Sequence, residues 1–234
     1  RIIGMIDNKV KLIKYDCASR NLLGTTGESP YNRSPFSTYQ GALTSIDLYH
    51  INSGGNPIND WSLSPLNKTN LNTSFINNIG TTWASKIITT TWKVGGGAPT
   101  NIMESVPKIA YQNEVGSSAS STTYDAKIGL MYVSDYYYAA GPSAWTLVGY
   151  SSSNPTTDYR VSTSINWMYM GMDEWTLTPN NSDSEMTFGI LSNGYVTTGF
   201  VSMDNYCVRP VFNLNTSVTY VSGDGTQSSP IRIN

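Results

Sequence analysis

The chain has 234 residues, which suits one large domain or two small ones and is enough to bury a sizeable core. Only 13% of the residues are charged, the formal net charge is −2, and lysine and arginine form no cluster. This argues against nucleic acid and anionic membrane as partners, because both bind clustered cations.

The composition is typical of a secreted or cell-surface β-protein. Serine, threonine, asparagine, glycine and tyrosine stand where most globular proteins carry charge, and the 16 tyrosines and 6 tryptophans set the chain apart from disordered ones. No apolar run approaches the roughly 20 residues of a membrane span, so we expect no membrane contact. The chain opens directly on strand-like RIIGMID, without a signal peptide. We therefore expect an excised part of a longer extracellular or bacterial cell-surface protein.

A β-hairpin is predicted at the start. Two runs rich in isoleucine, valine and leucine, RIIGMID and VKLIKYD, flank Asn8-Lys9, and apolar residues alternate in the second run. Ala18 to Pro57 is rich in turn residues, and one short helix is predicted within it, in YQGALTSIDLYH at 39–50.

A helical segment is predicted next, between Asp60 and Ser85. Ser64-Pro65 supplies an N-cap and a first-turn proline, apolar residues recur near helical spacing after it, and Gly80 would end the helix. WASKIITTTWKVGGG then predicts a short helix that leads into a strand.

The middle of the chain is predicted as loop, strand and loop. Residues 100–125 are polar and loop-like, Lys127 to Val133 is a strong strand closed by Ser134-Asp135, and residues 141–165 are loop again. If Tyr136 to Tyr138 continued in extended form, alternation would let only one or two of the three rings face the core.

The last third predicts strands joined by short turns. DEWTLTP is a strand ended by Pro179, and EMTFGILSNGYVTTGF is a hairpin with Asn193-Gly194 as a type I′ turn. CVRPVFNL is the last core strand, and VTYVSGDGTQSSPIRI makes a final hairpin around Gly223-Asp224-Gly225.

Together these elements indicate a single α+β domain over residues 1–234. It would have short antiparallel sheets, one or two helices in the first half, and long irregular loops. Because structureless loops longer than about 15 residues are uncommon in compact domains unless they have a function, we expect binding at the loops.

No residue pattern indicates a catalytic or metal site. His50 is the only histidine, the two cysteines lack zinc-binding spacing, and KVGGGAP lacks the lysine of a P-loop. Asp173 and Glu174 are adjacent at a strand start and so point to opposite faces, while a carboxylate pair between distant acids stays open. We expect no cofactor, with calcium on backbone carbonyls and scattered Asp or Asn left open.

Cys17 and Cys207 stand 190 positions apart and are either free and buried or bonded to each other. A disulfide would be unusual in a reducing cytosol and ordinary outside the cell. The pairing requires that the first hairpin and the last core strand be neighbours.

Five phrases follow in order a pattern of RIIG, KIGLL-x-x-SDY-x-YA, W-T-hydrophobic-S/T-P, VRPV-hydrophobic-x-L and GxGTxxxPY. They are Arg1-Ile2-Ile3-Gly4, Lys127 to Ala139, Trp175 to Pro179, Val208 to Leu214 and Gly223 to Pro230. The chain thereby resembles a largely uncharacterised domain family of gut Firmicutes surface and pilin-like proteins. Ile231 replaces the tyrosine after the last proline.

The layout is also similar to the C-type-lectin-like fold, in the broad sense that includes formylglycine-generating enzymes and retroelement-diversified proteins. That resemblance implies paired N- and C-terminal strands and long loops that present a ligand surface before the last strand. Pro210 would lie at a sheet edge or bulge, because proline cannot donate to a ladder, and Arg209 would clasp loop carbonyls or a carboxylate.

The expected function is that of an extracellular, non-catalytic adhesin-type domain for a carbohydrate or a host or bacterial surface protein. Tyrosine mixed with serine, asparagine and glycine is also what antibody paratopes use. Trp175 is expected in the core. The candidate ligand-binding residues are Tyr159, Trp167, Tyr169, Asn180, Asn181, Tyr195, Asp204, Asn205 and Tyr206.

Two alternatives stay open. The chain could be the structural head domain of a pilin-like fibre subunit. More remotely, it could be an enzyme like the formylglycine-generating ones, which would require a reactive cysteine pair that only Cys17 and Cys207 could supply.

Overall fold

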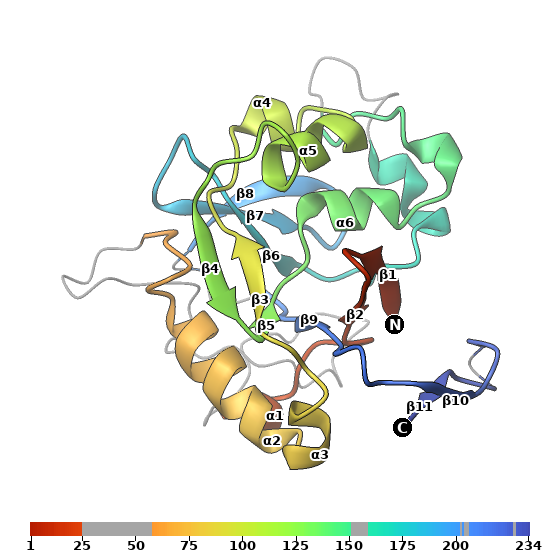
Figure 1. Ribbon diagram of the computed structural model, residues 1–234. Helices are drawn as coiled ribbons and strands as arrows, with labels where there is room; N and C mark the ends of the chain where they lie inside the picture. The colour runs from red at the N-terminus through yellow and green to blue at the C-terminus, as the bar shows by residue number, and fades with distance from the viewer. Residues whose placement is uncertain (25–57, 151–158, 202, 204–205, 227) are drawn as a thin grey trace.

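The computed structural model describes residues 1–24, 58–150, 159–201, 203, 206–226 and 228–234 (Figure 1). In this part of the chain short antiparallel sheets combine with short helices, which confirms the α+β class. The strands are β1 Ile2–Ile6, β2 Lys9–Ile13, β3 Thr90–Lys93, β4 Thr123–Ala126, β5 Ile128–Gly129, β6 Glu174–Pro179, β7 Met186–Ile190, β8 Val196–Phe200, β9 Val211–Asn213, β10 Tyr220–Ser222 and β11 Arg232–Ile233. The helices are α1 Arg20–Leu23, the π-helix η1 Leu66–Phe75, α2 Ile76–Asn78, α3 Thr81–Ala84, α4 Pro99–Ile102, α5 Pro107–Glu114, α6 Val133–Tyr138, and the 3₁₀ turns η2 Pro142–Ala144 and η4 Tyr159–Ile165.

The predicted N-terminal hairpin is confirmed, with its turn one residue earlier than expected. β1 and β2 pair antiparallel, and Ile6 stands opposite Lys9. Asp7 and Asn8 have φ angles of 49° and 60°, the left-handed pair that a two-residue type I′ turn requires. The hairpin therefore turns on Asp7-Asn8 and not on Asn8-Lys9.

The N-terminal hairpin and the late strand β9 meet in one sheet of order β1-β2-β9-β5. β9 pairs with β2 on one side and with β5 on the other, which confirms that N- and C-terminal strands pair. Cys17 follows β2, Cys207 precedes β9, and the two form a disulfide with Cα atoms 5.6 Å apart. The bond ties the start of the domain to its last core strand.

Pro210 is not at a sheet edge. It stands directly before β9, a central strand, and its carbonyl accepts the N–H of Lys14 at 3.0 Å. The ladder to β5 begins only at Val211, so the missing N–H of the proline costs no ladder bond.

Arg209 is a structural clasp, as predicted. Its Nε donates to Oε2 of Glu174 at 2.6 Å, and its Nη2 donates to the carbonyl of Met168 at 2.8 Å. Arg209 and Glu174 are both buried, so their ion pair links β6 to the residues just before β9 in the interior of the protein.

The helix predicted after Asp60 is present. Ser64 Oγ accepts the N–H of Asn67 at 3.3 Å, and η1 and α2 run on to the region of Gly80, whose φ of 83° ends the helix. α3 and β3 follow, as WASKIITTTWKV predicts. The short helix predicted at 39–50 lies outside the described residues.

The middle of the chain differs from prediction. Residues 100–125 contain the helices α4 and α5, each with proline in its first turn, and then β4. The strand expected over Lys127 to Val133 is reduced to β5, and α6 begins at Val133. Glu114 accepts the N–H groups of Val133 and Ser134, so a side chain distant in sequence caps α6.

The β6, β7 and β8 strands form a separate three-stranded sheet. Every residue of β6 is buried, and Trp175 stacks on Tyr206 with ring centroids 4.0 Å apart, which confirms Trp175 as a core residue. The predicted β7–β8 hairpin is present, but of its turn residues only Gly194 has a positive φ, so the turn is not type I′.

The final hairpin, β10 with β11, is confirmed and extends away from the body of the domain (Figure 1). Gly223 and Gly225 have φ angles of 98° and 89°, which permit its tight bend. Tyr220, Val221 and Ile231 are exposed on this arm.

Candidate binding groove

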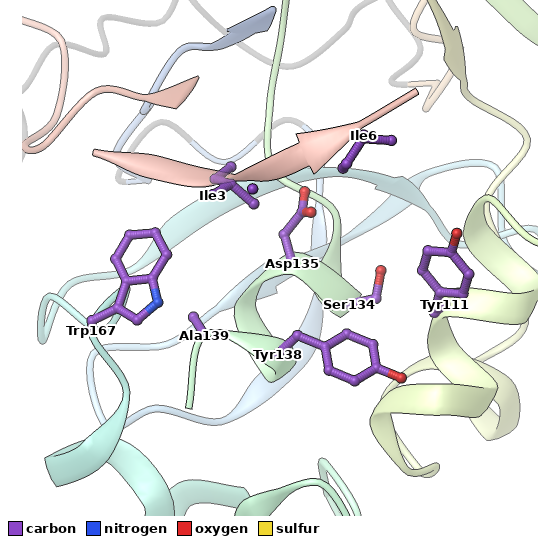
Figure 2. Close-up of a pocket in the computed structure, with 9 residues that line it drawn as sticks. Ile3, Ile6, Tyr111, Ser134, Asp135, Tyr138, Ala139 and Trp167 are labelled. Atoms are coloured by element: carbon purple, nitrogen blue, oxygen red, sulfur yellow. The ribbon is translucent and has the colours of Figure 1, made fainter. Parts of the chain in front are cut away.

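A groove of about 370 Å³ lies between the edge strand β1 and helix α6 (Figure 2). Ile3 and Ile6 of β1 form one wall, Asp135 and Ser134 of α6 face them, and Tyr111 of α5 closes one end. Trp167 stands at the other end. The full lining consists of Ile3, Gly4, Ile6, Tyr111, Ser134, Asp135, Tyr138, Ala139 and Trp167.

Three half-exposed aromatic rings form a continuous row beside this groove. Tyr111, Tyr138 and Trp145 are 45%, 38% and 40% exposed. The rings of Tyr111 and Tyr138 meet edge to face with centroids 6.4 Å apart, and those of Tyr138 and Trp145 do so at 5.2 Å. Both distances are typical of attractive aromatic pairs, so each ring holds its neighbour in place.

The backbone fixes this row. Tyr111 lies on α5, Tyr138 ends α6, and the Trp145 indole Nε1 donates to the carbonyl of Ala140 at 3.0 Å. Among the described residues, neither the Tyr111 nor the Tyr138 hydroxyl has a hydrogen-bond partner, so both are available to a ligand. Burial, and to a lesser extent the neighbouring Tyr111, raises the pKa of the Tyr138 phenol above its ordinary value.

The far end of the groove is held by the first residue of the chain. The Arg1 guanidinium lies 4.4 Å from the ring centroid of Tyr15 and 5.8 Å from that of Trp167, and it donates to the Trp167 carbonyl. Cation–π contacts of this kind orient the indole. Trp167 is thus a fixed aromatic group at the end opposite Tyr111.

The charge of the groove is balanced. Asp135 is the one charged side chain in the lining of the groove. The Asp135 Oδ2 accepts hydrogen bonds from the Lys11 Nζ at 2.5 Å and from the Tyr132 N–H at 2.9 Å. The groove therefore presents a neutral, mainly apolar surface with phenol hydroxyls along one side.

Glu114 caps the N-terminus of α6. It is fully buried, and its Oε1 accepts the hydroxyl of Thr178 at 2.5 Å in addition to the two N–H groups at the helix start. Burial raises the pKa of Glu114 to about 7, against the hydrogen bonds from Ser134 and Thr178, which lower it. The carboxyl is thus poised to titrate near neutral pH.

Three of the residues predicted to contact a ligand are buried, so their expected surface position is wrong. The Tyr159 hydroxyl donates to the carbonyl of Tyr137 at 2.6 Å, and Asn180 accepts the N–H of Ser182. Tyr206 stacks on Trp175. Each of these side chains makes its polar or aromatic contacts inside the protein and not with a ligand.

The other predicted residues have differing surroundings. Trp167 lines the groove, whereas the half-buried Tyr169 donates to the Ser192 carbonyl at 2.7 Å. Tyr195 is half-buried and packs edge to face against Tyr150, under the guanidinium of Arg160. Asn181 is exposed, and Asp204 and Asn205 lie outside the described residues.

Tyr111, Tyr138 and Trp145 were missed because their segments are predicted as loop or strand. A proline was the available signal for two of them, since Pro107 starts α5, which carries Tyr111, and Pro142 starts the turn that ends at Trp145. With α5 recognised, Tyr111 would have been placed on a helix.

Clusters of metal-ligating side chains and membrane-spanning helices were both sought in the described residues. These residues contain no group of three or more His, Cys, Asp or Glu side chains placed to hold a metal ion. His50 lies outside them. No helix in this part of the chain has the length and apolar character needed to cross a membrane.

Comparison with known proteins adds no relative. No family model, no curated protein and no solved structure matches the chain.

Proposed function

We propose that the chain is an extracellular, non-catalytic binding domain whose β1–α6 groove takes a carbohydrate. The observation that supports this most is the row of Tyr111, Tyr138 and Trp145 along an electrically balanced groove. Sugars carry apolar C–H faces and a rim of hydroxyls, so they suit aromatic rings that also offer polar edges.

The dimensions and chemistry fit a small ligand. Ligand pockets commonly measure about 300–1,000 Å³ and are lined by apolar and aromatic groups with a few polar ones. The groove has about 370 Å³, and the free phenol hydroxyls of Tyr111 and Tyr138 supply the polar groups. A charged ligand would find no uncompensated charge in this lining.

The extracellular setting has independent support. The buried Cys17–Cys207 disulfide is a feature of oxidising compartments. The low content of charged residues and the resemblance to gut Firmicutes surface proteins point the same way.

A glycan array probed with the whole chain tests the proposal. We expect a defined set of glycans to bind the native protein and to lose at least about tenfold in signal when Tyr111 and Tyr138 are both changed to alanine, because each stacked ring contributes on the order of 1 kcal/mol. Both side chains are half-exposed, so the variant should retain its melting temperature. Binding of proteins or peptides in place of any glycan, or glycan binding that survives the double change, would contradict it.

The second candidate is a structural head domain of a fibre. The β10–β11 arm favours it, because an isolated two-stranded sheet is marginal in water and this one exposes Tyr220, Val221 and Ile231. Sedimentation analysis of the whole chain, compared with a chain that lacks residues 216–234, would show self-association that depends on the arm.

A further inference from the structure

Lys11 and Asp135 form a buried contact between two elements far apart in sequence. Lys11 is in β2 and Asp135 is in α6, and Nζ lies 2.5 Å from Oδ2. Their side chains are only 5% and 10% exposed. The contact joins the N-terminal hairpin to the helix that forms the groove.

Aromatic rings enclose the lysine head group. Nζ lies 4.8 Å from the ring centroid of Tyr132 and 5.9 Å from that of Trp92. Both residues are buried, so little water reaches the pair. Burial of both groups excludes much of the water that would otherwise compete for the amine and the carboxyl group.

The backbone holds the carboxyl group in a fixed position. The N–H of Tyr132 donates to Asp135 Oδ2 at 2.9 Å, and Glu114 accepts the N–H of the adjacent Ser134 at 2.8 Å. The carboxyl carbon is one bond from the oxygen that Nζ contacts, so a small shift brings the reacting atoms to the roughly 3–3.5 Å of a near-attack geometry.

We propose that Lys11 and Asp135 condense to form an intramolecular isopeptide bond in the folded protein. The ammonium passes one proton to the carboxylate along the hydrogen bond, and the neutral amine attacks Cγ. The Tyr132 N–H holds Oδ2, the oxygen that takes the proton and later departs, in position. A C–N bond forms, a C–O bond breaks, and the departing oxygen takes two of the three ammonium protons as water.

This step needs no oxidant, metal or other reactant, and the water has an exit. Asp135 lines the β1–α6 groove, so the released molecule enters solvent directly. The proposal does not depend on the ligand of that groove. Its consequence is mechanical, because a second covalent link would join the N-terminal hairpin to the body of the domain.

The chain contains its own comparison. Lys14 and Asp16 also form a close ion pair, but their side chains are 24% and 49% exposed. Water stabilises both of these more exposed charges, so this pair should stay ionic. Proximity alone would predict that both pairs react, whereas burial predicts reaction only at Lys11–Asp135.

Intact-mass measurement of the denatured chain, after reduction of the disulfide, tests the bond. We expect the mass of the sequence less one water, and a proteolytic peptide pair joined through Lys11 and Asp135. K11R and D135A should restore the full mass, and K14R should leave the water loss unchanged. D135N should react with release of ammonia and give a joined product of the same mass as the native one.

Two results would overturn the proposal. One is the full mass with separate peptides in the native chain after prolonged incubation, with near-ultraviolet circular dichroism showing that it is folded. The other is a water loss that persists in K11R or maps to Asp224-Gly225, where cyclisation of the aspartate gives the same mass change. Because the native chain alone decides the first result, a variant that fails to fold leaves the test intact.

Discussion

The buried Glu114 makes the stability of the protein depend on pH in a direction opposite to that of an ordinary surface carboxylate. Its pKa is raised by burial to about 7, from an ordinary value of 4.5 in the unfolded chain. The folded state therefore binds the proton more tightly, and the stability from this binding is complete below about pH 4.5 and lost as the pH rises through 7.

The magnitude follows from the difference between these two values. At about 1.4 kcal/mol for each pKa unit, the unfolding free energy should fall by about 3 kcal/mol between pH 4.5 and pH 7.5. Burial also raises the pKa of Glu174, against the opposing effect of Arg209, so it adds a decline of the same sign.

Urea unfolding followed by tryptophan fluorescence, at half-unit pH steps with the disulfide intact, measures this dependence. In E114Q, which cannot ionise, we expect the decline to shrink to the part contributed by Glu174. E104Q is the matched control at a glutamate that is not buried, and it should retain the full decline. A native stability that rises with pH over this interval, or an E114Q profile that matches the native one, would show that Glu114 does not bind its proton more tightly in the folded state.

Three further changes test the interior. R209M should cost about 3–5 kcal/mol of unfolding free energy because it leaves Glu174 buried without its partner, and adding E174Q should recover part of this loss in urea titrations. Changing Cys17 and Cys207 together to serine should lower stability by about 5 kcal/mol in the chain-entropy model, as seen by calorimetry; an unchanged melting temperature would show that the bond is not structural. W175A should cost about 3–5 kcal/mol, measured in the same way, because it empties the centre of the core, and a loss below 1 kcal/mol would contradict that placement.

Patterns that are local in sequence predicted most of the architecture. The N-terminal hairpin follows from two alternating runs around a left-handed turn, and the helix after Ser64 follows from its cap, its proline and Gly80. The pairing of the N- and C-terminal strands was predicted through a resemblance, and the Cys17–Cys207 disulfide is one of the two alternatives that the sequence left open.

The errors arose where distant residues decide local structure. A short apolar run such as Lys127 to Val133 fits a strand and a buried helix equally well. The start of α6 at Val133 depends on Glu114, which is distant in sequence and accepts the N–H groups of Val133 and Ser134. The groove could not be predicted for the same reason. Its side chains come from β1, α5 and α6, and no spacing in the sequence indicates that these three elements are neighbours. Tyr159 and Tyr206 were placed on the surface by composition alone, whereas their hydroxyl and ring contacts bury them.

Titration calorimetry with one array-selected glycan tests most directly whether Tyr111, Tyr138 and Trp145 bind a carbohydrate. We expect Y138A to weaken binding about fivefold, the loss of one stacked ring at roughly 1 kcal/mol, and Y220A, at an exposed tyrosine on the β10–β11 arm, to leave it unchanged. Equal affinities for the native chain and Y138A, or a loss caused by Y220A alone, would contradict the assignment of the groove.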